Sequence, residues 1–398
     1  MPLPPVFRII VLSLLTHTAY KGSKMLMSLS ALDLGADEFF VGVLFSTYAL
    51  FPLLLSVYAG KISDRIGFRV PMLFGTIGLL AGLLLPFFVP RLETLYVAAG
   101  LIGFCYIFYT VAVQHLIGAM GDGLERTKNY SWFSLGIGMT ALLGPMSAGF
   151  LIDAVGHRMT FAVLAAMPVL PALVLGLWVG WLPRTAHVAV TPAEKATHRL
   201  GDLVRDRPLR RALITAGIIE TGLELYNLLL PIYGHRIGLS ASEIGLILGG
   251  FGLALLVVRA LMPHLVRRSS EERVLYASLL LAAAVCLVFP FVKSFPALLL
   301  ISFVLGMGLG CGSPLSMMLA YNRAPAGRSG EAMGLRQMVN KGTEILVPFV
   351  FGSLSAAFGM VPVFWLDAGL LAIAAALMRK DAAHVAAKKA PRAVNGKW

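Results

Sequence analysis

Residues 70–90 read VPMLFGTIGLLAGLLLPFFVP, a run without a single charged side chain. A helix needs about 20 apolar residues to cross the hydrocarbon core of a bilayer, so this stretch is long enough to span it. Residues 161–182 and 274–291 form similar runs. None of them alternates between apolar and polar residues, which favours helix over strand. The sequence therefore predicts an all-helical integral membrane protein.

The composition of the whole chain agrees with this class. Of its 398 residues, 58% are hydrophobic and 13% are charged, whereas soluble proteins average about 45–50% apolar and about 25% charged residues. This composition excludes a soluble enzyme. The three cysteines have no C-x-x-C spacing and are expected to be small core residues, and no group of side chains has metal-ligand spacing.

Apolar runs separated by short polar segments predict twelve transmembrane helices in two groups of six. The longest loop carries several arginines and divides the chain in the middle. We therefore expect an N-terminal six-helix bundle, a linker loop, a second six-helix bundle and a basic tail, over residues 1–182, 183–208, 209–379 and 380–398. The predicted helices cover residues 6–32, 39–60, 70–90, 94–119, 129–153, 159–182, 209–234, 241–263, 273–292, 296–321, 329–357 and 361–379.

The distribution of lysine and arginine predicts the orientation in the membrane. Most of the 33 basic residues fall in the loops on the side of the N-terminus, including the linker, the segment 259–273 and the tail. Basic short loops stay in the cytoplasm, so both termini are expected to be cytoplasmic, in an inner membrane of bacterial type. Contact with anionic lipid then accounts for the net charge of +13, and no nucleic-acid partner is expected.

The two halves repeat at one fixed offset. Residues 34–44 match residues 237–247 after a shift of 203 residues, and the same shift carries Pro145 and Gly149 onto Pro348 and Gly352. Because the same offset holds near the start and near the end of the half, it indicates that the two halves arose by duplication. Parallel repeats of this kind place a binding site at the midplane, between the halves.

The segment after the second predicted helix reads GKISDRIGFR, residues 60–69. It closely resembles the G-x-x-x-D-R-x-G-R-R signature of the major facilitator superfamily. The resemblance implies a secondary transporter that works by alternating access. It also implies a charge cluster that stabilises one closed state, to which Asp122 would add an acid. The residues implied in this conformational gating are Gly60, Asp64, Arg65, Gly67, Arg69 and Asp122.

The fifth predicted helix contains Gly144, Pro145 and Gly149, in an arrangement similar to a motif of the drug/proton antiporter branch of that superfamily. The resemblance favours export. Three features depart from the branch: Thr140 stands where the motif has an upstream glycine, Ala148 replaces one of the paired glycines, and the fourth helix lacks the arginine that the branch carries there. Close packing of small residues would explain the same pattern without any role in export.

Ionisable residues at membrane depth are costly, so they are the best pointers to a site. His17, Lys21 and Lys24 share one face of the first helix, and the shift of 203 residues takes them to Glu220, Glu224 and Asn227. We expect Lys21 and Lys24 to bind an anionic group of the substrate, while Glu220 or Glu224, with His17, carries a proton. Lys21 is expected to pair with Glu224, its symmetry mate. A fixed ion pair that only joins the halves is the alternative.

Further polar and aromatic residues are candidates for the wall of the substrate site. They are Tyr20, Tyr109, Gln114, Tyr226, Asn227 and Arg336. For Arg336, extension of the side chain toward the membrane surface is the alternative.

The sequence as a whole predicts a proton-coupled exporter of a small amphipathic or anionic compound. Uptake of an organic acid by proton symport is the alternative, favoured by the lysines of the first helix. A membrane-embedded sensor or enzyme is a remote third possibility. No ATP-binding motif is present, so the proton gradient is the expected energy source and no cofactor is expected. The expected partners are the solute and membrane lipid, and the protein is expected to be a monomer.

Overall fold

The computed structural model describes residues 5–118, 120, 123–177, 205–323 and 329–389. Within these ranges the elements are helices joined by short turns, which confirms the all-helical prediction. In the first part of the chain they are α1 (Pro5–Asp33), α2 (Glu38–Ile66), α3 (Arg69–Phe88), α4 (Leu92–Gly118), α5 (Gly123–Ala166) and α6 (Val169–Leu177). In the second part they are α8 (Arg207–Arg236), α9 (Ala241–Arg268), α10 (Glu271–Val288), η1 (Phe289–Phe291), α11 (Phe295–Gly310), α12 (Gly312–Asn322), α13 (Ser329–Phe358) and α14 (Met360–Lys389).

Four of the predicted helices differ from the structure in their ends or continuity. The second helix was expected to end at residue 60, but α2 continues to Ile66, so most of the segment 60–69 lies on its last turns. The fifth and sixth predicted helices run together in α5 through a kink at Gly156, where the backbone leaves the helical region. The predicted helix 296–321 is interrupted at Cys311, in a glycine-rich stretch, and forms α11 and α12.

Nine helical stretches in the described residues are long and apolar enough to cross a membrane. The difference from twelve has a simple origin. The fifth and sixth predicted helices count as one stretch, Trp132–Leu177. The other two, α1 and α13, carry the polar and charged side chains singled out in the sequence, which lower their mean hydropathy. A functional site would explain why these two helices, α1 and α13, carry polar side chains inside the membrane.

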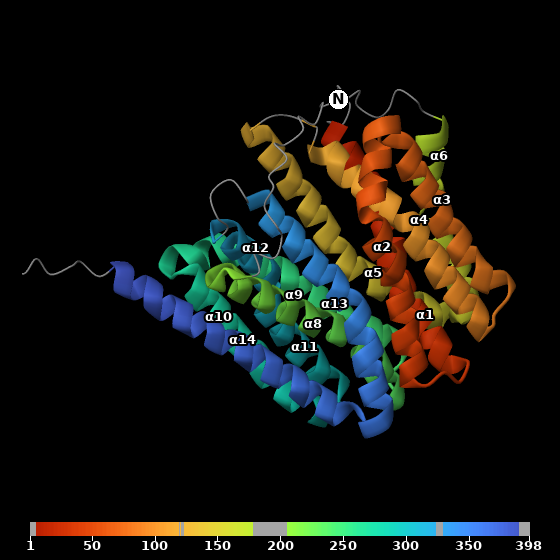
Figure 1. Ribbon diagram of the computed structural model, residues 1–398. Coiled ribbons are helices and arrows are strands. Elements are labelled where there is room, and N and C mark those ends of the chain that lie inside the picture. Colours follow the sequence, from red (N-terminus) through yellow and green to blue (C-terminus); the bar gives the residue numbers. More distant parts are fainter. Residues whose placement is uncertain (1–4, 119, 121–122, 178–204, 324–328, 390–398) are drawn as a thin grey trace, which may run out of the picture.

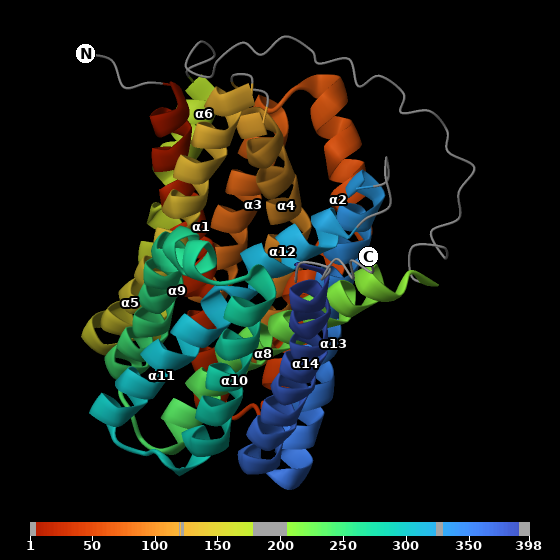
Figure 2. The same ribbon diagram turned by 90° about the vertical axis from the view of Figure 1, so that its left-hand side faces the viewer.

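The helices form two groups that lie side by side. Helices α1–α6 form the first half and helices α8–α14 the second, drawn in red to yellow and in green to blue (Figures 1 and 2). The halves meet mainly where α5 packs on α9 and where α2 packs on α13. Helices α1 and α8, which carry the two predicted polar stripes, also touch at this interface.

The turns of the two halves are built alike. Gly35, after α1, and Gly238, after α8, adopt φ of 86° and 79°, and Gly156 and Gly359 adopt 79° and 80°. Such positive φ angles favour glycine, which has no Cβ. Each pair is separated by 203 residues. We call the side of the protein that carries these four turns the hairpin side, and the side with the start of α1 and the turn at Gly67 the terminal side.

Glycines bring the two halves into direct backbone contact toward the hairpin side. A Cβ on Gly149 of α5 would collide with the carbonyl oxygen of Ala241 of α9, and a Cβ on Gly42 of α2 would collide with the carbonyl oxygen of Pro348 of α13. With the halves exchanged, the shift of 203 residues takes the first contact to Gly352 and Glu38 and the second to Gly245 and Pro145, and both of these pairs are in close contact as well. The Ser46 hydroxyl also donates a hydrogen bond of 2.9 Å to the Ile345 carbonyl, from α2 to α13. The halves are thus closed against each other by two pseudo-equivalent contacts.

Replacement of Gly149 by alanine is predicted to lower the melting temperature of the purified protein, because the added methyl group forces α5 away from α9. Gly369→Ala is the matched control, since no atom lies within 4 Å of its added Cβ. Alanine is favoured over glycine in a helix by about 1 kcal/mol, so the control is expected to be neutral or stabilising. Equal melting temperatures for the two variants would contradict the close contact.

Candidate functional site

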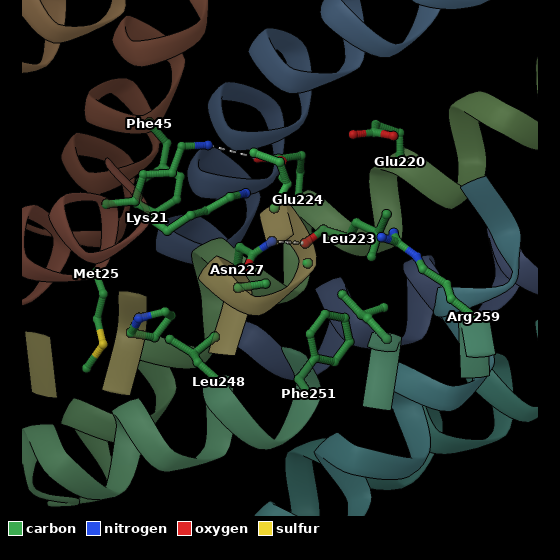
Figure 3. Close-up of a pocket in the computed structure, with 16 residues that line it drawn as sticks. Lys21, Met25, Phe45, Glu220, Leu223, Glu224, Asn227, Leu248, Phe251 and Arg259 are labelled. Carbon is green, nitrogen blue, oxygen red and sulfur yellow. Dashed lines mark hydrogen bonds and ion pairs between the residues drawn. The ribbon is translucent and has the colours of Figure 1, made fainter. Parts of the chain in front are cut away.

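A cavity of about 230 Å³ lies between the halves and is lined by residues of both. Six of its lining residues were predicted from the sequence as site residues. Five belong to the two polar stripes, Lys21, Lys24, Glu220, Glu224 and Asn227, and Pro145 belongs to the α5 motif. The first two come from α1 and the other three stripe residues from α8. Figure 3 shows Lys21 and Glu224 extending from their two helices into the same cavity. The structure therefore brings a cationic and an acidic stripe to one cavity.

The ion pair across this cavity joins Lys24, not Lys21, to Glu224. The Lys24 Nζ lies 3.8 Å from Glu224 Oε2, and the two side chains are 16% and 12% exposed. The prediction that Glu224 pairs with its symmetry mate Lys21 is therefore wrong. Positions related by an internal two-fold axis lie at equal depth but need not face each other. Lys24, nearly one turn further along α1, also lies over the ring of Phe45, 5.6 Å from its centroid.

Glu220 and Asn227, the other two polar residues that α8 contributes, are each oriented by a hydrogen bond. Glu220 Oε2 accepts a hydrogen bond of 3.1 Å from Asn340 Nδ2 of α13. Asn227 Nδ2 donates to the Leu223 carbonyl of its own helix at 2.8 Å, which leaves its amide oxygen at the cavity. The Lys341 ammonium pairs with Glu344 on the same turn of α13. Glu220 is thus oriented by α13 and is not paired with a cation within 4 Å among the described residues.

His17 and the predicted tyrosines lie behind the cavity wall. His17 is 7% exposed, shares a hydrogen bond of 2.9 Å with the Ser13 carbonyl and packs edge-on against Tyr106 and Tyr109. Tyr109 is fully buried and donates a hydrogen bond to Ser13 Oγ at 3.1 Å. Tyr20 stacks on Tyr106 with ring centroids 3.9 Å apart. These residues form an aromatic core in the first half and are not among the residues that line the cavity.

Of the other residues predicted for the wall of the substrate site, Arg336 and Gln114 do not line the cavity, whereas Tyr226 packs against a residue that does. Arg336 is 5% exposed and donates hydrogen bonds from Nη2 to Ser313 and Ser316 of α12, so it neither lines the cavity nor extends to the surface. Gln114 has an exposed side chain and is not a lining residue. Tyr226 stacks on Phe251, with ring centroids 4.1 Å apart, and Phe251 lines the cavity.

Sequence analysis missed a cation in this cavity. Arg259 was counted with the basic loop segment 259–273, but it lies within α9 and lines the cavity together with Phe251 and Leu255. The predicted helix 241–263 already contained this position. Its place inside that helix was the signal that could have identified it.

The segment 60–69 forms the end of α2 and the turn to α3. Gly67 adopts φ of 81° and its N–H donates to the Ser63 carbonyl at 3.0 Å, so it ends the helix that carries Gly60 and Arg65. Arg69 donates hydrogen bonds of 2.6 and 2.7 Å to the carbonyls of Leu175 and Gly176 at the end of α6. The side chain of Asp64 and the whole of Asp122 lie outside the described residues.

The α5 motif serves two helix contacts. A Cβ on Gly144 would press against Gly22 and Lys21 of α1, whereas Gly149 packs on α9. Pro145 lines the cavity between these contacts. The motif therefore holds α5 close to the helix of the cationic stripe and, one turn further on, to the second half.

A further set of contacts, which we call the hairpin-side latch, was not predicted. Asp153 of α5 accepts hydrogen bonds from the backbone N–H groups of Ala241 (3.1 Å) and Ser242 (2.8 Å), the first residues of α9. Arg236 Nη2 lies 2.6 Å from Glu38 Oε1, which joins α8 to α2. A carboxylate at a helix N-terminus satisfies free N–H groups and the helix dipole. Both contacts connect the first half to the second.

The latch is not symmetric. The shift of 203 residues takes Asp153 to Ala356, which has no group that could cap α2. A second cavity of about 310 Å³ lies there, lined by Ala356 together with Asp37, Glu38 and Arg236. Asp37 caps α2 from within the same half, through a hydrogen bond of 2.9 Å to the Phe40 N–H. Only one of the two equivalent interfaces thus has a cap that crosses between the halves.

Comparisons with known proteins agree with this geometry. The family model of the Major Facilitator Superfamily matches residues 9–340 and 212–396. Among curated proteins, the multidrug resistance protein MdtG of Klebsiella pneumoniae (strain 342) is 24% identical over 340 residues, which cover 83% of this chain and 80% of that protein. The quinolone resistance protein NorA of Staphylococcus aureus (strain MSSA476) is 21% identical over 334 residues, covering 83% and 85%.

Solved structures show the same fold at low sequence identity. A peptide transporter POT in complex with sulfate superposes with a TM-score of 0.78 at 16% identity, over 96% of this chain and 94% of that one. A nucleoside transporter, NupG, superposes with a TM-score of 0.74 at 14% identity, over 95% and 99%. The chain therefore belongs to the major facilitator superfamily and is an integral membrane secondary transporter, not an enzyme.

Proposed function

We propose that this transporter exports a small amphipathic or anionic compound in exchange for protons. The observation that carries the proposal is the Lys24–Glu224 ion pair, which crosses a cavity between the two halves. The similarity to proteins named for multidrug and quinolone resistance supports the direction of transport. The motif of Gly144, Pro145 and Gly149 in α5 supports it as well.

The pair offers a way to couple proton binding to a change of conformation. Lys24 belongs to the first half and Glu224 to the second, so a movement of one half against the other changes their distance. A carboxylate that loses its cation in a poorly hydrated site is stabilised by taking up a proton. Glu224 therefore exchanges a lysine partner for a proton as the halves move, and Glu220 is the second candidate carboxyl.

Alternating access requires that the hairpin-side latch opens. The Asp153 cap on α9 and the Glu38–Arg236 pair hold this side closed in the present conformation. When the hairpin side opens, the terminal side has to close, and there Asp64, with Arg65, is the candidate latch. By the distribution of basic residues the terminal side is cytoplasmic, in an inner membrane of bacterial type. The present conformation would then be closed to the outside.

Uptake of an organic acid together with protons is the second candidate function. Lys21 favours it, because this cation lines the cavity and has no acid within 4 Å among the described residues. The fourth helix also lacks the membrane arginine of the antiporter branch. The direction of proton movement during solute flow separates the two: antiport moves the proton and the solute in opposite directions, and symport moves them together.

Neutralisation of the proton-coupling carboxyl is predicted to abolish accumulation of solute against its gradient but to preserve solute exchange, which needs no net proton movement. Glu220→Gln and Glu224→Gln are compared in proteoliposomes with Glu93→Gln, an exposed acid at the start of α4. The solute is the member of a panel of amphipathic cations, zwitterions and aromatic acids that raises the melting temperature of the protein most. If both cavity variants still concentrate it, proton coupling lies elsewhere.

The Lys24–Glu224 pair is predicted to be a working pair and not only a structural one. Removal of one partner leaves an unpaired buried charge that costs up to about 3–5 kcal/mol, while removal of both is often tolerated. We therefore expect Lys24→Gln to lose stability and transport. The double variant with Glu224→Gln should regain stability and stay inactive, because the charge that transport needs is still missing.

The matched control for this pair is the double variant Lys341→Gln, Glu344→Gln, which removes an ion pair within a single helix, α13. Pairs at this spacing contribute about 0.2–0.5 kcal/mol, so the control should keep its stability. Thermal unfolding and proton-driven transport are measured for each protein. Recovery of coupled transport by the neutral Lys24, Glu224 variant would show that the pair is only structural.

A further inference from the structure

Arg259 is a cation of the cavity that its surroundings leave unsatisfied. Its side chain extends from α9 into the cavity toward Leu223 of α8 (Figure 3). The Nε atom is buried, and no hydrogen-bond partner for it is found among the described residues. None of the described carboxylates lies within 4 Å of its guanidinium group, so no ion pair forms there. Burial of a charged group without a partner is costly, which makes this position unusual.

Other cations that lie deep in the second half and in α1 do have partners in the protein. Lys24 is paired with Glu224, and Lys341 is paired with Glu344. The Nε of Arg336 also lacks a hydrogen-bond partner among the described residues, but its Nη2 makes three hydrogen bonds to Ser313 and Ser316. Among the described cavity residues, Arg259 and Lys21 thus remain without an acidic partner. They belong to opposite halves, on α9 and α1.

The charge of the cavity wall is unbalanced. Three cations line the cavity, Lys21, Lys24 and Arg259, but only two carboxylates do, Glu220 and Glu224. With all five groups ionised, the wall carries one excess positive charge. Glu220 is included in this balance, but it forms no ion pair with Arg259 within 4 Å, and its Oε2 accepts a hydrogen bond from the neutral amide of Asn340. A guest with one negative charge would therefore balance the wall.

The rest of the wall next to Arg259 is apolar and rigid. Leu255, Phe251 and Leu248 lie about one, two and three turns before it on α9, on the same helix face. The Phe251 ring is fixed by stacking on Tyr226, with centroids 4.1 Å apart. The volume of about 230 Å³ is below the roughly 300–1,000 Å³ of pockets for drug-sized ligands, so the guest has to be small.

We infer that Arg259 anchors the carboxylate of the transported solute, and that the solute class is small aromatic or aliphatic monocarboxylates. A guanidinium group binds a carboxylate through two parallel hydrogen bonds, and Lys21 supplies a second positive charge from the other half. The apolar body of the acid packs on Phe251 and its neighbours. This inference rests on the proposed transport function, because it places the solute in the same cavity.

The shift of 203 residues takes Arg259 to Ser56 in the first half. The duplicated fold therefore does not require a cation at this position. An arginine that has no counterpart at the equivalent position of the first half, lines the cavity and has no acidic partner among the described residues fits a role in recognition of one particular guest.

Binding to the purified full-length protein in detergent tests this inference. The probes are 4-ethylbenzoate, its neutral amide and 4-ethylbenzylammonium, which share the same apolar body and differ in charge. Thermal shift and isothermal titration are measured for each probe. Only the carboxylate is expected to raise the melting temperature and to bind. Loss of charge-assisted hydrogen bonds to the guanidinium predicts about 10-fold to 100-fold weaker binding for Arg259→Gln.

Two further variants make the test specific. Arg259→Lys keeps the charge but loses the paired hydrogen bonds, so its affinity for the carboxylate should fall between wild type and Arg259→Gln. Arg268→Gln removes an exposed cation near the end of the same helix and should bind like wild type. Should Arg259→Gln fail to fold, the comparison of the three probes on the wild-type protein and on Arg259→Lys decides the question.

Equal binding of the amide, a preference for the ammonium compound, or unchanged affinity in Arg259→Gln would each overturn the inference. Absence of binding by the carboxylate to the wild-type protein would do the same. The measurement uses no proton gradient, so it is independent of coupling. Carboxylate binding through Arg259 without transport in proteoliposomes would count against the proposed function and leave the binding site intact.

Discussion

The cost of a charge inside the membrane is the constraint on which the rest of this structure depends. Five ionisable side chains line one cavity of a chain that is otherwise strongly apolar, and each needs a partner or water. The fold meets this need at the interface of its two halves, where α1 brings lysines and α8 brings glutamates. The Lys24–Glu224 pair therefore has two effects: it makes the burial of both charges tolerable, and it makes the energy of the cavity depend on the distance between the halves.

Close backbone contact on the hairpin side positions this pair. The helix pairs α5–α9 and α2–α13 are pseudo-equivalent, and Gly149 and Gly42 bring their backbones together with no side chain between them. The polar latch does not follow the symmetry, since Asp153 caps α9 whereas Ala356 leaves a cavity at the equivalent place. The glycines thus give both interfaces the same shape, and one carboxylate adds a directional bond that a movement of the halves has to break.

Much of the fold could be predicted from the sequence because the signals are local. Apolar length set the spans, and the offset of 203 residues anticipated that Gly35 and Gly238 end their helices in the same conformation. The two polar stripes were also predicted, since helical spacing places their residues on one face and their ionisable groups mark an interface. The end of α2 was missed, because the polar residues 60–66 resemble a loop although they continue a helix.

The partners of individual side chains could not be predicted in the same way. Whether Lys21 or Lys24 meets Glu224 depends on the rotation of α1 against α8, which the symmetry of the repeat does not determine. Arg336 binds α12, a partner set by tertiary packing. Asp153 is separated from Ala241 by 88 residues in the chain, so nothing local indicates the cap. Arg259 was obscured by the neighbouring basic loop, although its position within a helix is plain from the sequence.

The central claim is that the two halves move about the cavity when the carboxyls exchange a cation for a proton. Distances between spin labels test it most directly, in a variant without the three native cysteines. One label pair, at exposed Ala154 and Ser240, reports the hairpin side, and the other, at exposed Lys61 and Gln337, reports the terminal side. The account predicts that acidification lengthens the first distance and shortens the second, and that Glu224→Gln fixes one population at every pH. Distances that do not respond to pH in the wild-type protein would contradict it.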